Sequence, residues 1–232
     1  ACLVGSEMCI RDSIGEEGES VYKEQSILEE KAYRDTWGRG LESYLKMIYD
    51  RLVLMRDLLS PAGTIYVHLD YRADYLIRAV MDEVFGSDSF VNEIVWYYPA
   101  ASAATTSFFT RSHHLIWMYA KNPKSRLFRG DDPEIFMPYS ERVLNALNKD
   151  EEGRYYYYRG GSFGGKKIAD RVYVDNPEAG QFPKDVWTDI PYVRANTPEF
   201  QGFETQKPEK LLRRIIAASS PPGGLVADFF CG

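Results

Sequence analysis

The sequence of 232 residues has few cysteines and no long hydrophobic run. Cys2, Cys9 and Cys231 form an odd set at the two extremes of the chain, which excludes a disulfide framework and favours a reducing compartment. No stretch of about 18 apolar residues occurs, and no basic start leads into an apolar core with a small-residue cleavage site. We therefore predict a cytoplasmic protein that does not interact with a membrane.

The chain does contain enough apolar residues for a globular core. Hydrophobic residues make up 44% and charged residues 27%, which excludes disordered and collagen-like chains. The net charge of −6 is uneven, because residues 1–35 carry a balance of −5 and residues 111–171 carry +4. A polyanion is therefore expected to meet the chain within residues 111–171.

The two ends of the chain differ from the segments beside them. Residues 1–13 have no periodicity that continues into the neighbouring segment, and they look like translated sequencing-adaptor sequence. We expect a non-native leader that lies outside the fold. Residues 225–232 predict a buried parallel strand and then the first glycine of a turn. Such a strand needs further neighbours, so we expect a fragment that is truncated at both ends.

Periodic segments before residue 121 predict an α/β sheet. Apolar residues at helical spacing indicate helices, and runs of β-branched and aromatic residues indicate strands. Helices are predicted over 41–59 and 71–85, a strand over 64–70, and the strands of an antiparallel hairpin over 91–98 and 114–119. Alternation of helix and strand is typical of the α/β class.

Regular patterns fail between residues 121 and 202, where seven prolines and the glycines at 160–165 interrupt every periodic run. We predict an inserted, loop-rich subdomain. Order resumes at Pro208, which suits the first position of a helix, and Glu209, which suits the positive end of its dipole. The predicted division is a leader over 1–13, a core over 14–120, the insert over 121–202 and a second core part over 203–232.

Two segments near the C-terminus suggest a ligand site. In residues 227–232 an acid and then a glycine follow a strand, which is where an open α/β sheet binds nucleotide-like ligands, although an ordinary strand end fits the same spacing. TQKPEKLLRRII (205–216) and ADFFCG (227–232) resemble the cofactor-binding half of S-adenosylmethionine-dependent DNA amino-methyltransferases. Residues 35–70 and NEIVW (92–96) resemble the modification subunits of type III restriction systems.

This resemblance spans residues 33–121 and 185–232 and implies an incomplete Rossmann-like methyltransferase sheet with a target-recognition insert. It implies S-adenosylmethionine as the cofactor and methyl transfer to the exocyclic amine of adenine in double-stranded DNA. A restriction subunit and a second copy of the chain are the further partners that we expect. The family's motifs place the cofactor at Thr205, Gln206, Lys207, Pro208, Asp228, Phe230, Cys231 and Gly232. Phe229 stands where many members have proline.

The family's catalytic motif, Asp-Pro-Pro-Tyr/Phe, is expected before the helix at 41–59 but is absent between residues 14 and 41. In the family this acid and a backbone carbonyl accept hydrogen bonds from the amine of a flipped base. The catalytic residues are therefore left unassigned, and we expect the chain alone to be inactive. Asp70 is a weaker candidate, and the alternative is that it caps the helix at 71.

Two segments resemble functional motifs without matching them. Residues 189–192 (DIPY) differ from the catalytic motif by one residue but follow an interrupted polar segment, so we expect a structural link. Residues 160–167 have the spacing of a phosphate-binding loop, but Lys167 stands where Ser or Thr should hold magnesium. We predict instead a mobile basic loop, with Arg159, Lys166 and Lys167 contacting DNA.

Arg111 and His113 precede the last predicted strand before the insert. The resemblance places this stretch near the base pocket, so we expect both residues to contact DNA, and a solvated turn is the alternative. Adjacent histidines on a strand point to opposite faces, so we predict no metal site here.

Two functional classes remain open. The first is a methyltransferase acting on adenine, or on the N4 amine of cytosine. The second is a non-catalytic nucleic-acid-binding protein that retains the sheet, which predicts salt-sensitive DNA binding without any effect of the cofactor.

Overall fold

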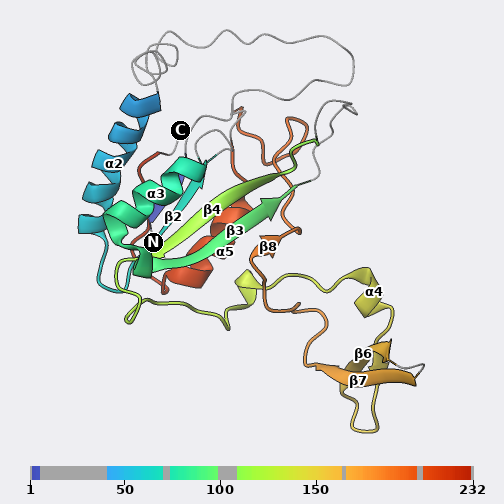
Figure 1. Ribbon diagram of the computed structural model, residues 1–232. Coiled ribbons are helices and arrows are strands. Elements are labelled where there is room, and N and C mark those ends of the chain that lie inside the picture. Colours follow the sequence, from blue (N-terminus) through green and yellow to red (C-terminus); the bar gives the residue numbers. More distant parts are fainter. Residues whose placement is uncertain are drawn as a thin grey trace. The chain divides into compact units, whose positions relative to one another are not determined.

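The computed structural model describes residues 2–5, 41–69, 74–98, 109–163, 166–202 and 206–230. The chain divides into two compact units (Figure 1). We call residues 1–129 and 185–232 the sheet unit, and residues 130–184 the hairpin unit. These bounds are narrower than the predicted insert over 121–202. No helix in the described ranges is long and apolar enough to cross a membrane.

A six-stranded sheet organises the sheet unit. In spatial order its strands are β8 (Val186–Trp187), β3 (Phe90–Tyr97), β4 (His113–Ala120), β2 (Thr64–Leu69), β1 (Cys2–Gly5) and β9 (Ala227–Asp228). β4 is antiparallel to both of its neighbours, as the predicted hairpin requires, and the other neighbouring pairs are parallel. The five strands other than β4 therefore end at one edge, which we call the carboxyl edge. The predicted Rossmann-like α/β sheet is confirmed.

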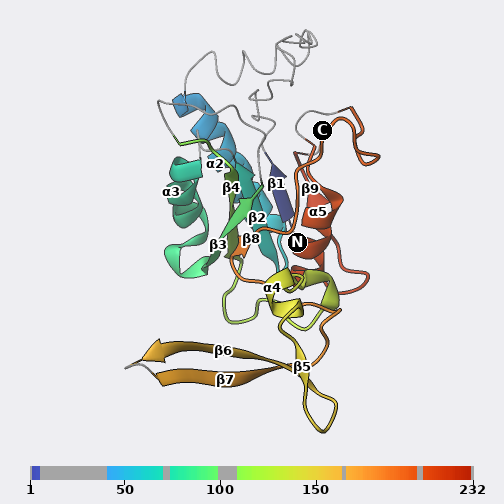
Figure 2. The same cartoon turned by 90° about the vertical axis from the view of Figure 1, so that its right-hand side faces the viewer.

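Helices cover both faces of this sheet (Figure 2). The helices α2 (Leu41–Leu58) and α3 (Asp74–Phe85) lie on one face, and α5 (Glu209–Ser219) lies on the other; a short 3-10 turn, η1 (Ser87–Ser89), follows α3. The apolar stripe predicted for α2 is buried in the core at Tyr44, Ile48, Leu52, Met55 and Leu59. Helical periodicity at residues 41–59 therefore marked the face that packs on the sheet.

Side-chain alternation along β2 divides the sheet into two different surfaces. Ile65, Val67 and Leu69 join the core cluster together with residues of α2 and α3. Tyr66 and His68 point to the opposite face, since successive side chains of a strand alternate. All six residues of β2 are buried, so the Tyr66 hydroxyl and the His68 ring need hydrogen-bond partners inside the protein.

The two outer strands differ from what the sequence predicts. Residues 2–5, expected to lie outside the fold, form β1 between β2 and β9, and parallel pairing on both sides gives their backbone groups partners. The predicted buried strand at 225–230 is reduced to Ala227–Asp228, and Leu225 is 89% exposed. β9 is the last strand in the sheet order, so one of its sides has no neighbouring strand among the described residues.

The hairpin unit contains more regular structure than the predicted loop-rich insert. Its elements are η2 (Pro133–Ile135), α4 (Glu141–Leu144), β5 (Asn148–Lys149), β6 (Tyr155–Phe163) and β7 (Lys166–Val174). β6 and β7 pair in antiparallel register from Tyr155–Val174 to Phe163–Lys166. An isolated bridge between Met137 and Gln181 closes the base of the unit.

Candidate functional site

The carboxyl edge collects several of the predicted site residues. Asp228 ends β9 there, and the reversed strand β4 begins there at His113. The backbone N–H of Tyr98, just after β3, donates to the Ser112 carbonyl at 2.8 Å. Arg111 directly precedes these residues and so lies at the same edge.

Helix α5 begins at this edge. At its C-terminal end, the hydroxyls of Ser219 and Tyr66 lie 2.6 Å apart, which places that end beside the first half of β2. Before its N-terminal end, Lys207 lies close enough to act electrostatically on His68, the penultimate residue of β2. α5 is therefore antiparallel to β2, and residues 206–208 lie at the carboxyl edge.

The Gln206 amide holds the segment that precedes α5. Its Oε1 accepts a hydrogen bond from the Gln201 backbone N–H at 2.7 Å, and its Nε2 donates to the Glu199 carbonyl at 2.8 Å. The Glu199 side chain in turn accepts from the Glu209 backbone N–H, one of the groups that a helix start leaves without an internal partner. The described contacts of Gln206 thus fix the position of Lys207.

Asp228 shapes the turn after β9. Its Oδ1 accepts a hydrogen bond from the Phe230 backbone N–H at 3.0 Å, which is the contact of an Asx turn. Phe230 packs against the core cluster of the sheet unit, while the Phe229 side chain is about half exposed. Packing of Phe230 on the core therefore anchors the turn, and Asp228 itself is exposed.

A histidine pair, in which His68 is buried and His114 half-buried, lies beside the start of α5. His68 Nε2 and His114 Nδ1 are 2.9 Å apart, so one ring donates to the other. Burial and then the charge of Lys207 lower the pKa of His68 well below its usual value. The same two causes lower the pKa of His114 to about 4. Both rings are therefore neutral at pH 7.

Aromatic rings surround this histidine pair. The Trp96 ring meets His68 edge to face with centroids 5.6 Å apart, and Tyr98 lies 5.2 Å from both Trp96 and His114. Tyr192 extends the group at 5.7 Å from Tyr98. We call Trp96, Tyr98, His114 and Tyr192 the edge aromatic group. Sequence reasoning missed it, although the alternation of polar and aromatic residues in β2, β3 and β4 was the available signal.

Arg111 and His113 are exposed at the start of β4. His113 points to the face opposite His114, because the two are neighbours on one strand. Within the described ranges, no three His, Cys, Asp or Glu side chains gather in a way that would hold a metal ion. Contact of Arg111 and His113 with DNA stays a prediction.

Comparison with known proteins supplies the family. Residues 18–232 match the family described as DNA methylase. The chain belongs to this family. Its relatives include the type II methyltransferase M.EcaI of Enterobacter cloacae, which is 24% identical over 88% of this chain and 53% of its own length. The DNA adenine methyltransferase YhdJ of Escherichia coli is 30% identical over 85% of this chain and 58% of its own length.

Other relatives extend this DNA methylase comparison. The Mod subunit of the type III restriction-modification enzyme StyLTI of Salmonella typhimurium is 24% identical over 82% of this chain and 36% of its own length. The chain spans about half the length of the first curated relatives it matches. A crystal structure of an M1.HpyAVI–SAM complex aligns with 77% of this chain and 62% of that chain, with 14% identity and a TM-score of 0.39.

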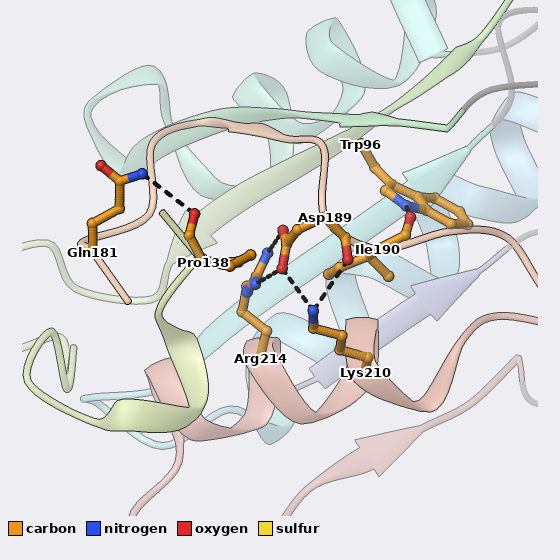
Figure 3. Close-up of polar contacts among 7 residues, drawn as sticks. All are labelled: Trp96, Pro138, Gln181, Asp189, Ile190, Lys210 and Arg214. Atoms are coloured by element: carbon orange, nitrogen blue, oxygen red, sulfur yellow. Dashed lines mark hydrogen bonds and ion pairs between the residues drawn. The ribbon is translucent and has the colours of Figure 1, made fainter. Parts of the chain in front are cut away.

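The near-match to the catalytic motif of the DNA methylases, which begins at Asp189, is structural (Figure 3). The Arg214 guanidinium donates to both carboxylate oxygens of Asp189, at 2.9 and 2.7 Å, and Lys210 pairs with it at 2.8 Å. Burial favours a raised pKa for Asp189, but the hydrogen bonds from Arg214 and Lys210 outweigh it and lower the pKa. Trp96 Nε1 donates to the Ile190 carbonyl at 2.8 Å. The expected structural link is confirmed.

The glycine-rich segment of this DNA methylase chain is part of a hairpin and not a phosphate-binding loop. Residues 160–163 belong to β6, and Lys166 and Lys167 belong to β7. A phosphate-binding loop joins a strand to a helix, whereas these strands pair antiparallel. The predicted mobile loop is therefore wrong for the described residues. DNA contact by Arg159, Lys166 and Lys167 stays a prediction.

Four predicted residues lie outside the described part of the chain. They are the cofactor candidates Thr205, Cys231 and Gly232 and the weaker catalytic candidate Asp70.

Proposed function

We propose that the chain is part of an S-adenosylmethionine-dependent methyltransferase that modifies the exocyclic amine of adenine in double-stranded DNA. The observation that carries the proposal is that the start of α5 and Asp228 lie at one carboxyl edge in a member of the DNA methylase family. Ligands of open α/β sheets bind outside the carboxyl ends of the strands. The names of the relatives include a DNA adenine methyltransferase, which supports adenine as the target.

The charges at this edge suit a zwitterionic nucleoside. S-adenosylmethionine supplies an electrophilic methyl group on a sulfonium centre, and it also carries an ammonium and a carboxylate. The exposed Asp228 carboxylate favours a cationic group, and Lys207 favours an anionic one. Gln206 positions Lys207, and Phe230 anchors the turn that holds Asp228.

The edge aromatic group supports the nucleic-acid part of the proposal. An exocyclic amine is not reachable inside a duplex, so the target base must be extruded and held between aromatic or apolar side chains. Tyr98 and Tyr192 are half-buried rings at the same edge as Asp228. A restriction subunit and a second copy of the chain are proposed as further partners because some relatives are type III Mod subunits.

The sequence holds no Asp-Pro-Pro-Tyr/Phe tetrapeptide, so we expect this chain to bind the cofactor weakly without transferring its methyl group. Isothermal titration of S-adenosylmethionine into the full chain tests this. We expect saturable binding that Asp228→Asn weakens about fivefold or more, as the loss of one charge contact predicts. Asp50→Asn, at an exposed carboxylate on α2, is the matched control and should leave binding unchanged.

Two results would contradict the proposal. One is the absence of saturable cofactor binding by the wild-type chain, which would favour the non-catalytic nucleic-acid-binding alternative. The other is equal binding by the Asp228→Asn and Asp50→Asn variants, which would remove the carboxyl edge as the site.

A further inference from the structure

One face of the β6–β7 ribbon carries arginines and tyrosines in alternation. The Arg154 guanidinium lies 4.7 Å from the Tyr173 ring centre, and the Tyr173 and Tyr156 ring centres are 5.9 Å apart. Arg171 lies 4.8 Å over Tyr156, whose ring also meets Tyr158 edge to face at 5.5 Å. We call these five residues the arginine–tyrosine face.

Part of the opposite face of the ribbon, near Tyr155 and Val174, is covered from within the hairpin unit. Val174, on that face, is buried, and Lys149 of β5 lies 4.6 Å over the Tyr155 ring. Tyr157 lies near Tyr139, since it helps raise the pKa of that residue. By contrast, the Tyr158 and Tyr173 side chains are 53% and 44% exposed. Four members of the arginine–tyrosine face are therefore exposed to solvent, and they surround the buried Tyr156 ring.

Positive charge is concentrated on this ribbon. Residues 154–174 hold five of the eight basic residues of the hairpin unit but one of its ten acidic residues. The Tyr158 and Tyr173 hydroxyls raise the pKa of Arg171, and no carboxylate among the described residues forms an ion pair with it. A polyanion would therefore meet the ribbon at a charge that the protein has not neutralised.

We propose that the arginine–tyrosine face enters the major groove of double-stranded DNA and that Arg171 contacts base edges there. This inference rests on the proposed function, because it assigns the surface with which the methyltransferase reads its substrate. The major groove admits a two-stranded β-ribbon, and arginine binds guanine through two parallel hydrogen bonds. The pair beyond Tyr158 and Arg171 on this face is Gly160–Ala169, and because this pair carries only the methyl group of alanine, a groove wall can approach the ribbon closely there.

Arg159 provides a matched control for Arg171. Both arginines are exposed on the same two paired strands, but Arg159 lies opposite Asp170 and on the other face of the ribbon. Either substitution by alanine removes one positive charge. A general electrostatic role therefore predicts equal losses of affinity, whereas base contact by Arg171 predicts unequal losses.

The test uses the full chain and a random-sequence pool of duplexes, from which the wild type selects its preferred sequences. Fluorescence anisotropy on a selected duplex should show that Arg171→Ala weakens binding about tenfold or more, since a bidentate base contact contributes about 1–3 kcal/mol. Arg159→Ala should weaken it about twofold to threefold, the loss of one phosphate contact. Arg171→Lys should keep the charge but still lose sequence preference, because lysine lacks the planar fork.

Several results would overturn the inference. They are the absence of sequence enrichment, stronger binding to single strands than to duplexes, equal losses in the two alanine variants, and competition by the minor-groove ligand netropsin but not by the major-groove ligand methyl green. Circular dichroism checks that each variant is folded. Titration with S-adenosylmethionine separates this inference from the proposed function: Arg171→Ala should bind the cofactor as the wild type does, whichever way the DNA result falls.

Discussion

Two arginines, one in each unit, have the same kinds of partner and very different surroundings. Arg214 in the sheet unit pairs with Asp189 and lies 5.0 Å from the Trp187 ring, with 1% of its side chain exposed. Arg154 in the hairpin unit pairs with Asp150 and lies 4.7 Å from the Tyr173 ring, with 57% exposed.

The difference in burial between these two arginines determines how much their ion pairs contribute to stability. The Arg214 and Asp189 side chains have lost most of their water, so removal of Asp189 leaves the Arg214 guanidinium buried without its carboxylate, and removal of Arg214 leaves Asp189 with Lys210 as its charged partner. The Arg154 guanidinium keeps much of its hydration, although the Asp150 side chain with which it pairs is only 9% exposed. Its other partner, Glu152, is 71% exposed, and an ion pair of this exposed kind contributes little to stability. The sheet unit thus uses buried polar residues to hold segments together, whereas the hairpin unit exposes an arginine with the same kinds of partner to solvent.

The largest effect is expected at Arg214. Arg214→Ala removes one of the two charged partners of the buried Asp189 carboxylate and leaves the other, Lys210. This change should lower the free energy of unfolding by about 3–5 kcal/mol. Tryptophan fluorescence during urea unfolding measures this for the sheet unit alone, because the four tryptophans all lie outside residues 130–184.

A double variant provides the control for this prediction. Arg214→Met combined with Asp189→Leu removes both charges and keeps much of the volume, so it should be closer to wild type than Arg214→Ala. If the single and double variants lose equal stability, packing rather than charge explains the cluster, and the contrast with Arg154 fails.

Sequence alone predicted the elements whose pattern reflects one buried face. In α2, Ile48, Leu52 and Met55 are spaced so that they share the face that packs on the sheet, and this helical periodicity is enough to predict the helix and its buried face. The strand at Thr64–Leu69 was equally clear from its β-branched and aromatic residues. The predicted start of α5 at Pro208 agrees with the structure to one residue.

The remaining features depend on contacts that a linear pattern does not encode. β6 was missed because its run of four tyrosines has no polar alternation, and the strand becomes apparent only from its pairing with β7. The histidine pair joins His68 to His114 across two strands, which needs the antiparallel register of β2 and β4. The Gln206 motif was found from resemblance, but its contact with Glu199 needs the fold of the preceding loop.

A second prediction concerns pH and the buried histidines. Unfolded histidines take up a proton near pH 6.5, whereas folded His114 does so at about pH 4. Between these values the unfolded state binds more protons, so stability is full above about pH 7 and falls as the pH drops towards 4. The loss for His114 should reach about 3 kcal/mol.

Urea unfolding at a series of pH values, followed by tryptophan fluorescence, measures this dependence. His114→Gln should flatten the curve, whereas His113→Gln, at the exposed neighbouring position, should leave it as in the wild type. If both variants keep the wild-type slope, the buried pair does not control the acid sensitivity of the sheet unit.

The smallest effect is expected at Arg154, the exposed member of the comparison. Arg154→Ala removes the ion pairs of an exposed arginine and one ring contact, so the tryptophan-monitored midpoint should not change, and amide exchange in β6 should rise only slightly. Hydrogen-exchange mass spectrometry of peptides covering 150–174 measures the second quantity. A large loss of protection would mean that Arg154 holds the ribbon together as Arg214 holds the sheet unit. In that case the difference in exposure between Arg154 and Arg214 would not predict how much each stabilises its unit. The arginine–tyrosine face would then have a structural role in the hairpin unit, which would have to be measured before the face is tested as a DNA-binding surface.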